Sequence, residues 1–361
     1  MRHATTKIAG RARGTRVLVV GGGVSGLASA WALLERGFEV LVREKDDGAR
    51  IASSVAAAIW HPFAVGGART DRWAAQTWGW LVDCARDPTS GVLVRRGLEC
   101  LREVESPLPG WTALHPSWRR ARADELPPDR PAGLVFDAPV AEMGVFLPWL
   151  RRKAEERGAR IERRAMASLA ECAREADLVV NCAGLGAREL ACDAGLEAWR
   201  GSVLRVERGT LESFLLDSHG DEATYIVPRS KDCVLGGSVE PGRESLEADP
   251  ATLEAIRARC EARVPRLAGA RVLSHATHLR PWRREVRLEA ERLAEGGLVV
   301  HNYGHGGAGV TLARGCALEV ADLVEAGSVE AGSATPERHA DAAAGCEGRS
   351  ASAATRASGP A

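Results

Sequence analysis

Apolar positions between residues 16 and 44 predict a strand, a helix and a second strand. Residues 16–21 read RVLVVG, a β-branched run of strand length. Residues 24–37 carry apolar side chains at helical spacing and stop at a glycine, which is typical of a helix end. The next apolar run, FEVLVR at 38–43, leads directly into Glu44. These segments predict a βαβ unit.

A second α/β passage follows in residues 143–184. FLPWLRRKAEERG at 146–158 has helical spacing, a short polar-rich strand comes next, and ADLVVNCAG at 176–184 is typical of a buried strand. Near the end of the chain, GLVVHN predicts another strand from residue 297. We expect a Gly-rich loop and then a helix, VTLARGCALEVADLVEAG, after that strand.

Two other regions have a different residue pattern. Residues 60–140 hold six of the ten tryptophans and many prolines, which favours a separate lobe of loops and helices. Between 200 and 240 the runs GSVLRVE, TYIVPR and CVLGGSV show period-two alternation, so we expect an antiparallel sheet there.

Composition narrows the classes of partner. The 48 basic and 48 acidic residues cancel, so net charge gives no general attraction to nucleic acid or to an anionic membrane. No apolar run reaches the roughly 18 residues that a membrane span needs. The nine cysteines form no C-x-x-C pair, and several lie in apolar runs where reduced thiols are usual. We expect a cytoplasmic protein that binds small molecules.

The first chemical motif is Gly21-x-Gly23-x-x-Gly26, placed between the first strand and the first helix. Gly21 allows a tight turn, Gly23 lets backbone approach a pyrophosphate, and Gly26 lets the helix pack close to the strand. Glu44 would accept hydrogen bonds from a ribose. The motif predicts a dinucleotide site and leaves open whether the nucleotide is FAD or NAD.

The second motif is HNYGHGGAG at 301–309, which runs into a helix with Thr311 in its first turn. Backbone N–H groups at such a helix start attract anions, although a Gly-rich turn without a ligand has the same appearance. His301 and His305 raise the question of a metal, but no carboxylate or cysteine completes a ligand set.

Two further side chains are candidates for substrate binding. Pro281 favours an extended Arg280, whose guanidinium could hold a carboxylate by two parallel hydrogen bonds. Tyr225 is one of only two tyrosines, and packing in a strand is the ordinary interpretation of its position.

Taken together, these segments resemble the D-amino acid oxidase family, which is FAD-dependent and related to D-aspartate oxidase. The resemblance covers residues 16–326. Its most specific piece is HNYGHGGAGVTL, and the others are VVGGGVSGL, SSVAAAIWHPF, ADLVVNCAGLGA, the Arg-Gly of WRGSVLRVE, TYIVP and LRPWRREVRLE.

The resemblance implies a role for each matching residue. Arg280 would bind the substrate carboxylate, the Tyr225 hydroxyl would assist it, and the Gly307 carbonyl would receive the substrate amine. FAD would contact Gly21, Gly23, Val24, Ser25, Gly26, Glu44, Ser53, Ser54, Ala57, Ala58, Met166, Gly184, Arg280, Gly306, Gly307, Gly309, Val310 and Thr311.

The implied reaction is the oxidation of a D-amino acid to an imino acid by hydride transfer to flavin N5. Water then gives the 2-oxo acid and ammonia, and O₂ becomes hydrogen peroxide. A glycine/sarcosine-type or tailoring amine oxidase is the alternative within the flavin enzymes. An NAD-dependent or regulatory nucleotide-binding protein is the alternative outside them, and a homodimer stays open.

We expect an α/β plus α+β fold with a Rossmann-like FAD-binding domain and a second, mainly antiparallel substrate domain. The FAD-binding domain would comprise residues 16–60, 143–198 and 270–326, and the substrate domain 61–142 and 199–269. Residues 1–15 and 327–361 are predicted to be disordered.

The chain also departs from the family pattern. His278 replaces a usual glycine, Arg314 a common tryptophan, and Asp221 a lid tyrosine, while His61 stands where many members carry glutamine and Ala308 where some carry tyrosine. These departures bear on the choice of substrate, and they suggest a more open and acidic entrance. If His61 faces the pocket, we expect it to favour acidic side chains.

Overall fold

One mixed sheet runs through the part of the chain that the computed structural model describes, residues 15–45, 51–62, 65–176, 178–217, 223–294 and 296–333. Its strands, in chain order, are β1 (Arg16–Val20), β2 (Glu39–Glu44), β3 (Val92–Leu101), β4 (Trp118–Arg120), β5 (Ala132–Ala141), β6 (Arg160–Arg163), β7 (Leu178–Asn181), β8 (Glu197–Glu207), β9 (Phe214–Asp217), β10 (Thr224–Pro228), β11 (Asp232–Gly236), β12 (Glu240–Pro241), β13 (Val272–Arg292) and β14 (Leu298–His305).

The sheet has a parallel half and a mainly antiparallel half. The strand order is β4-β5-β3-β9-β10-β11-β8-β13-β14-β7-β1-β2-β6, with β12 paired to β8 outside this path. From β14 to β6 every neighbour is parallel. From β13 to β9 the neighbours are antiparallel. The α/β passages and the antiparallel strands predicted from the sequence therefore belong to one continuous sheet.

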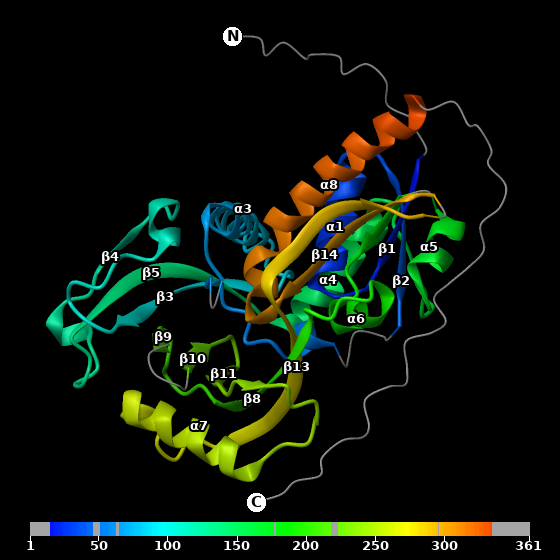
Figure 1. Ribbon diagram of the computed structural model, residues 1–361. Coiled ribbons are helices and arrows are strands. Elements are labelled where there is room, and N and C mark those ends of the chain that lie inside the picture. The colour runs from blue at the N-terminus through cyan, green and yellow to red at the C-terminus, as the bar shows by residue number, and fades with distance from the viewer. Residues whose placement is uncertain are drawn as a thin grey trace, which may run out of the picture.

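Helices cover both faces of the parallel half (Figure 1). The helix α1 packs against α8 and α4, and α3 packs against α8. On the antiparallel half, α7 packs under β8, β10 and β11. The helices are α1 (Val24–Glu35), α2 (Ala52–Val55), α3 (Ala68–Cys84), α4 (Met143–Glu156), α5 (Leu169–Glu175), α6 (Ala187–Leu190), α7 (Pro250–Arg263) and α8 (Gly309–Ser333).

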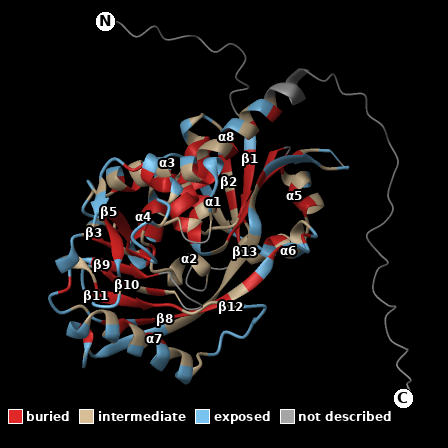
Figure 2. Cartoon of the chain, turned by 60° about the vertical axis from the view of Figure 1, so that its left-hand side comes forward, coloured by how far each residue is buried: buried red, intermediate tan, exposed pale blue. Residues whose placement is uncertain are grey.

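The innermost parallel strands are buried on both faces because helices cover both. In β1 only the first residue is exposed, and every residue of β7 and β14 is buried. Figure 2 shows this contrast between the buried strands and the exposed outer surfaces of the helices. The predicted βαβ unit is confirmed, since α1 connects β1 to its parallel neighbour β2. None of the helices in the described ranges combines the length and apolarity needed to cross a bilayer.

Strand β13 joins the two halves. Its first part, up to Trp282, pairs with β8, and its second part, from Arg287 on, pairs with β14, with a register shift between Trp282 and Arg287. No pattern in the sequence predicts this 21-residue strand. Most of its residues are only partly buried or exposed, so no apolar alternation marks it.

Three predictions about local structure are wrong. Residues 60–140 are not a lobe of loops and helices, because they contain the long antiparallel pair β3–β5. The Gly-rich loop expected after Asn302 is strand up to His305, and every residue of this strand is buried. The disordered tail was predicted to begin at residue 327, but α8 continues to Ser333. The predicted extension 1–14 and the tail from 334 lie outside the described residues.

Two helical glycines offer a matched test of the contact between α3 and α8. A Cβ on Gly315 would lie 2.2 Å from the Cα of Trp73, whereas a Cβ on Gly144 would meet nothing within 4 Å. We expect Gly315→Ala to lower the free energy of unfolding by about 1–3 kcal/mol through overpacking. Gly144→Ala should leave it unchanged or raise it slightly. Urea unfolding measures the free energy of unfolding of both variants. Equal stabilisation by the two substitutions would contradict this packing.

Candidate active site

A cavity of about 600 Å³ opens between the carboxyl ends of β1 and β2 and the antiparallel half of the sheet. Ligands commonly bind at this edge of a parallel sheet, in pockets of about 300–1,000 Å³. Most of the residues predicted from the sequence border it: Gly21, Gly23, Val24, Ser25, Glu44, Ser53, Ala57, Ala58, Met166, Gly184, Tyr225, Arg280, Gly306, Gly307, Gly309, Val310 and Thr311.

The glycines of the first motif allow close contacts between backbone segments. Gly21 has a φ of +116°, which L side chains rarely adopt. A Cβ on Gly21 would lie 2.3 Å from the carbonyl oxygen of Cys182, and a Cβ on Gly26 would lie 1.8 Å from that of Gly21. Gly26 does not border the cavity. It allows α1 to start close against the turn, as its place in the motif predicts.

Ser53 and Ser54, which were predicted together, have different surroundings. The Ser53 hydroxyl accepts a hydrogen bond from the backbone N–H of Val24 at 3.2 Å, so it fixes the start of α1. The Ser54 hydroxyl donates to the Ile51 carbonyl at 2.7 Å, and Ser54 is absent from the residues that line the cavity.

The second glycine motif places the N-terminus of the long helix α8 at the cavity. Strand β14 ends at His305, and α8 begins at Gly309 after a single 3₁₀ turn. The helix start carries a partial positive charge and free N–H groups. Thr311 in its first turn is already engaged, because its Oγ1 donates to the His61 carbonyl at 2.9 Å and accepts from the His61 N–H at 3.2 Å.

His305 is buried beside this helix start and stays uncharged at neutral pH. Its Nε2 lies 3.1 Å from Oδ1 of Asn302. Burial lowers the pKa of His305 to about 4, because no carboxylate compensates the loss of solvation. Across the described residues, no three His, Cys, Asp or Glu side chains gather as metal ligands would.

Arg280 and Tyr225 meet at the other end of the cavity. Arg280 lies on β13, and its Nη1 donates to the Ser238 carbonyl at 2.9 Å. A Cβ on Gly201 would lie 2.0 Å from that nitrogen, so the guanidinium rests directly on the Gly201 backbone. The Tyr225 ring lies over Gly236 in the same way, with a hypothetical Cβ 2.0 Å from the ring Cζ.

The Tyr225 hydroxyl hydrogen-bonds the Arg280 guanidinium, and two opposing effects act on its acidity. Burial raises the pKa of Tyr225, and the nearby positive charge of Arg280 lowers it, with a net rise. Tyr225 therefore stays protonated at neutral pH. A guanidinium and a phenol at one end of a cavity are able to bind a carboxylate together.

The residues in which the chain departs from the family pattern are also placed. His61 and His278 border the cavity. Arg314 does not border it and pairs with Glu35 at 2.5 Å. Ala308 is buried, and Asp221 lies outside the described residues.

Sequence reasoning missed Ser238, Leu216 and Glu99. Ser238 and Leu216 border the cavity, and Glu99 lies 3.1 Å from the His61 ring. No motif marks these residues, because they reach the site only through the pairing of strands distant in sequence.

Comparison with known proteins agrees with this geometry. The model of the DAO family, described as FAD dependent oxidoreductase, matches residues 16–323. This chain belongs to that family. It is 50% identical over 313 residues to the D-amino-acid oxidase of Rubrobacter xylanophilus, covering 86% of this chain and 96% of the relative. It is 41% identical over 322 residues to the D-amino-acid oxidase of Streptomyces coelicolor, covering 86% and 97%.

The fold also has known counterparts. The crystal structure of glycine oxidase from Geobacillus kaustophilus matches with a TM-score of 0.72 at 19% identity, over 86% of this chain and 95% of that one. Membership of the FAD dependent oxidoreductase family confirms FAD as the cofactor, and the NAD-dependent alternative is discarded.

The residues of this family member fit a dinucleotide. Glu44 is buried at the end of β2, where Oε1 accepts from Arg151 and Oε2 has no partner among the described residues. A Cβ on Gly22 would lie 2.0 Å from Oε2, so only glycine leaves this carboxylate open to the cavity. An unpartnered buried carboxylate is costly, and ribose hydroxyls would satisfy it.

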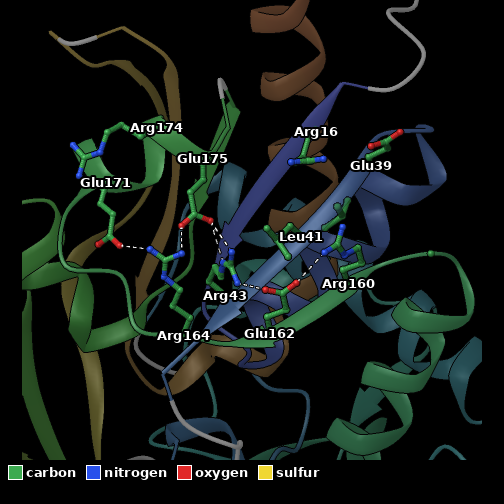
Figure 3. Close-up of a pocket in the computed structure, with 12 residues that line it drawn as sticks. Arg16, Glu39, Leu41, Arg43, Arg160, Glu162, Arg164, Glu171, Arg174 and Glu175 are labelled. Carbon is green, nitrogen blue, oxygen red and sulfur yellow. Dashed lines mark hydrogen bonds and ion pairs between the residues drawn. The ribbon is translucent and has the colours of Figure 1, made fainter.

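A second hollow, of about 750 Å³, follows the outer side of β2 and β6 (Figure 3). Its charged side chains largely pair with one another: Arg43 with Glu162 and Glu175, and Arg164 with Glu171 and Glu175. Arg43 and Arg164 border both hollows. The charges in this hollow therefore largely satisfy one another, and we propose no ligand for it.

Glu44 gives the most direct test of the nucleotide end. We expect Glu44→Gln to weaken FAD binding by roughly 10- to 100-fold, because a hydrogen bond to a charged acceptor contributes about 1.5–3 kcal/mol. Flavin fluorescence during titration of the apoprotein measures this. Glu39→Gln, on the exposed start of the same strand, is the control and should bind FAD normally. Equal affinities in the two variants would remove Glu44 from the cofactor site.

Proposed function

We propose that this protein oxidises D-amino acids to imino acids, with O₂ as the electron acceptor and hydrogen peroxide as a product. The observation that carries the proposal is the Arg280–Tyr225 pair at one end of the cofactor cavity. The relatives at 50% and 41% identity, both named D-amino-acid oxidase, support it.

Arg280 binds the substrate carboxylate in this proposal. A guanidinium has five N–H donors, and the backbone carbonyls of Ser238 and Arg200 engage only Nη1. The remaining donors can take a carboxylate through two parallel bonds. Tyr225, protonated at neutral pH, donates a further hydrogen bond to the same group.

The glycine motif before α8 orients the rest of the substrate. The carbonyl of Gly307 would accept a hydrogen bond from the substrate amine, and Gly309, Val310 and Thr311 would lie against the flavin. Bound FAD supplies the hydride acceptor and passes the electrons on to O₂. The partial positive charge of the α8 start favours the negative charge that reduction places nearby.

Selectivity for one enantiomer of the substrate follows from fixing more than one of its groups. With the carboxylate on Arg280 and Tyr225 and the amine on Gly307, the Cα hydrogen of only one enantiomer points toward the flavin. The protein needs no acid–base side chain at Cα, because orientation is its main contribution.

The compartment and the oligomeric state stay predictions. The cysteines of the described residues are free thiols, and all but Cys192 are buried, which supports the expected cytoplasmic location. A homodimer is an expectation that size measurement in solution would test.

The proposal is tested by peroxide formation over a panel of D- and L-amino acids, glycine and sarcosine. We expect several D-amino acids to give peroxide and their L-enantiomers to give none. Turnover confined to glycine or sarcosine would replace this proposal with the glycine-type alternative. Arg280→Met should raise the KM for D-alanine at least tenfold and leave FAD bound. Arg284→Met, an exposed neighbour on the same strand, is its control.

A further inference from the structure

A buried histidine–glutamate pair lies at the margin of the cavity, away from Arg280. His61 borders the cavity, and its Nε2 lies 3.1 Å from Oε1 of Glu99. Both side chains are mostly buried, with 10% and 13% of their surfaces exposed. The second oxygen of Glu99, Oε2, has no hydrogen-bond partner among the described residues.

The strand register places this pair along the line that a substrate side chain would follow. Glu99 on β3 lies opposite Leu216 on β9, and Leu216 lies opposite Tyr225 on β10. Neighbouring strands are about 4.8 Å apart, so Glu99 is roughly 10 Å from Tyr225 across the sheet. Leu216, between them, borders the cavity. A substrate carboxylate at Tyr225 therefore leaves its side chain room to extend over Leu216 toward His61.

The pair presents no net positive charge to that side chain. Next to a carboxylate oxygen, Nε2 of His61 carries a proton, which leaves Nδ1 as the acceptor in the neutral ring. If the ring takes a second proton, its charge only balances that of Glu99. The pair is therefore neutral or negative, and neither state attracts a carboxylate.

The other cations that line the cavity do not change this result. Arg280 serves the α-carboxylate in the proposed function. Arg43 and Lys45 flank Glu44 in sequence, and the Arg164 N–H donates to the Glu44 carbonyl at 2.9 Å, so all three belong to the nucleotide end. Two further histidines border the cavity: His305, whose lowered pKa of about 4 keeps it uncharged at neutral pH, and His278, two residues before Arg280 on β13.

We propose that the His61–Glu99 pair selects the substrate side chain, excluding carboxylates and favouring groups that donate hydrogen bonds, such as carboxamides. Glu99 acts through His61 as a positioning residue. The inference rests on the proposed function, and it reverses the expectation that His61 favours acidic side chains.

The wild-type enzyme gives the first test. D-Asparagine and D-aspartate have nearly the same shape, as do D-glutamine and D-glutamate, so the kcat/KM ratio within each pair isolates charge. We expect each amide to exceed its acid by at least tenfold. D-Alanine, whose methyl group is too short to reach His61, reports the proposed function separately. Oxidation of D-alanine together with a preference for the acids would overturn the selection, and no oxidation of D-alanine would overturn both.

Variants then assign the selection to the pair. Glu99→Gln keeps the shape, but its amide can donate a hydrogen bond to Nε2 as well as accept one, so the ring no longer has to present Nδ1 as an acceptor. The amide-to-acid ratio should then fall at least tenfold. Glu125→Gln, a surface glutamate paired with Arg119, is the matched control and should keep the wild-type ratio. In a His61→Asn background, Glu99→Gln should change the ratio much less, because the residue through which it acts is gone.

A purely structural role for Glu99 predicts a different pattern. Amide and acid turnover would then fall together, the ratio would stay constant, and the proposal would fail. If Glu99→Gln does not retain FAD, the His61→Asn single variant decides, since it should also bring the ratio closer to one. A wild-type ratio in His61→Asn would contradict the inference.

Discussion

A guanidinium resting on bare backbone is the contact on which the site depends. Arg280 can lie in the cavity because residue 201 has no side chain, and the ring of Tyr225 lies over Gly236 for the same reason. The Ser238 carbonyl holds one nitrogen of this cation at 2.9 Å. A cation that is partly withdrawn from water is costly unless an anion pairs with it, so the position of Arg280 favours the binding of a carboxylate, as proposed.

The sheet sets the distance between this anchor and the cofactor. Strand β13 carries Arg280 where it pairs with β8, and the same strand continues into its pairing with β14, which leads to α8. The proposed carboxylate anchor and the helix proposed to face the flavin are thus fixed to one continuous ladder of hydrogen bonds. Such a framework can hold both within the tolerance that oriented hydride transfer requires.

The sequence predicted best what is local. The turn at Gly21, the helix after it and the acidic end of β2 lie within about thirty residues, and each has its own signal. Strand β13 was not predicted, because its run of arginines and glutamates is partly exposed. It therefore shows neither period-two alternation nor an apolar core. The β3–β5 pair was hidden among tryptophans and prolines that suggested loops.

Site residues divide in the same way. Arg280 and Tyr225 had weak signals of their own, and only the family resemblance gave them roles. Glu99 had no signal, because it lies on β3, while the segment of His61 meets the sheet at β5 through the Ile59–Val140 bridge, and nothing in its neighbourhood along the chain marks it. Contacts made by strand register are set by the whole sheet, and a local pattern does not encode them.

Gly201→Ala tests the central claim most directly. Its Cβ would occupy the space of the Arg280 guanidinium, while leaving Arg280 itself and the nucleotide end of the cavity unchanged. We expect an increase of at least tenfold in the KM for D-alanine, with normal FAD content and absorbance. A wild-type KM in a folded, FAD-loaded Gly201→Ala variant would show that the guanidinium does not need this position, and would contradict the account.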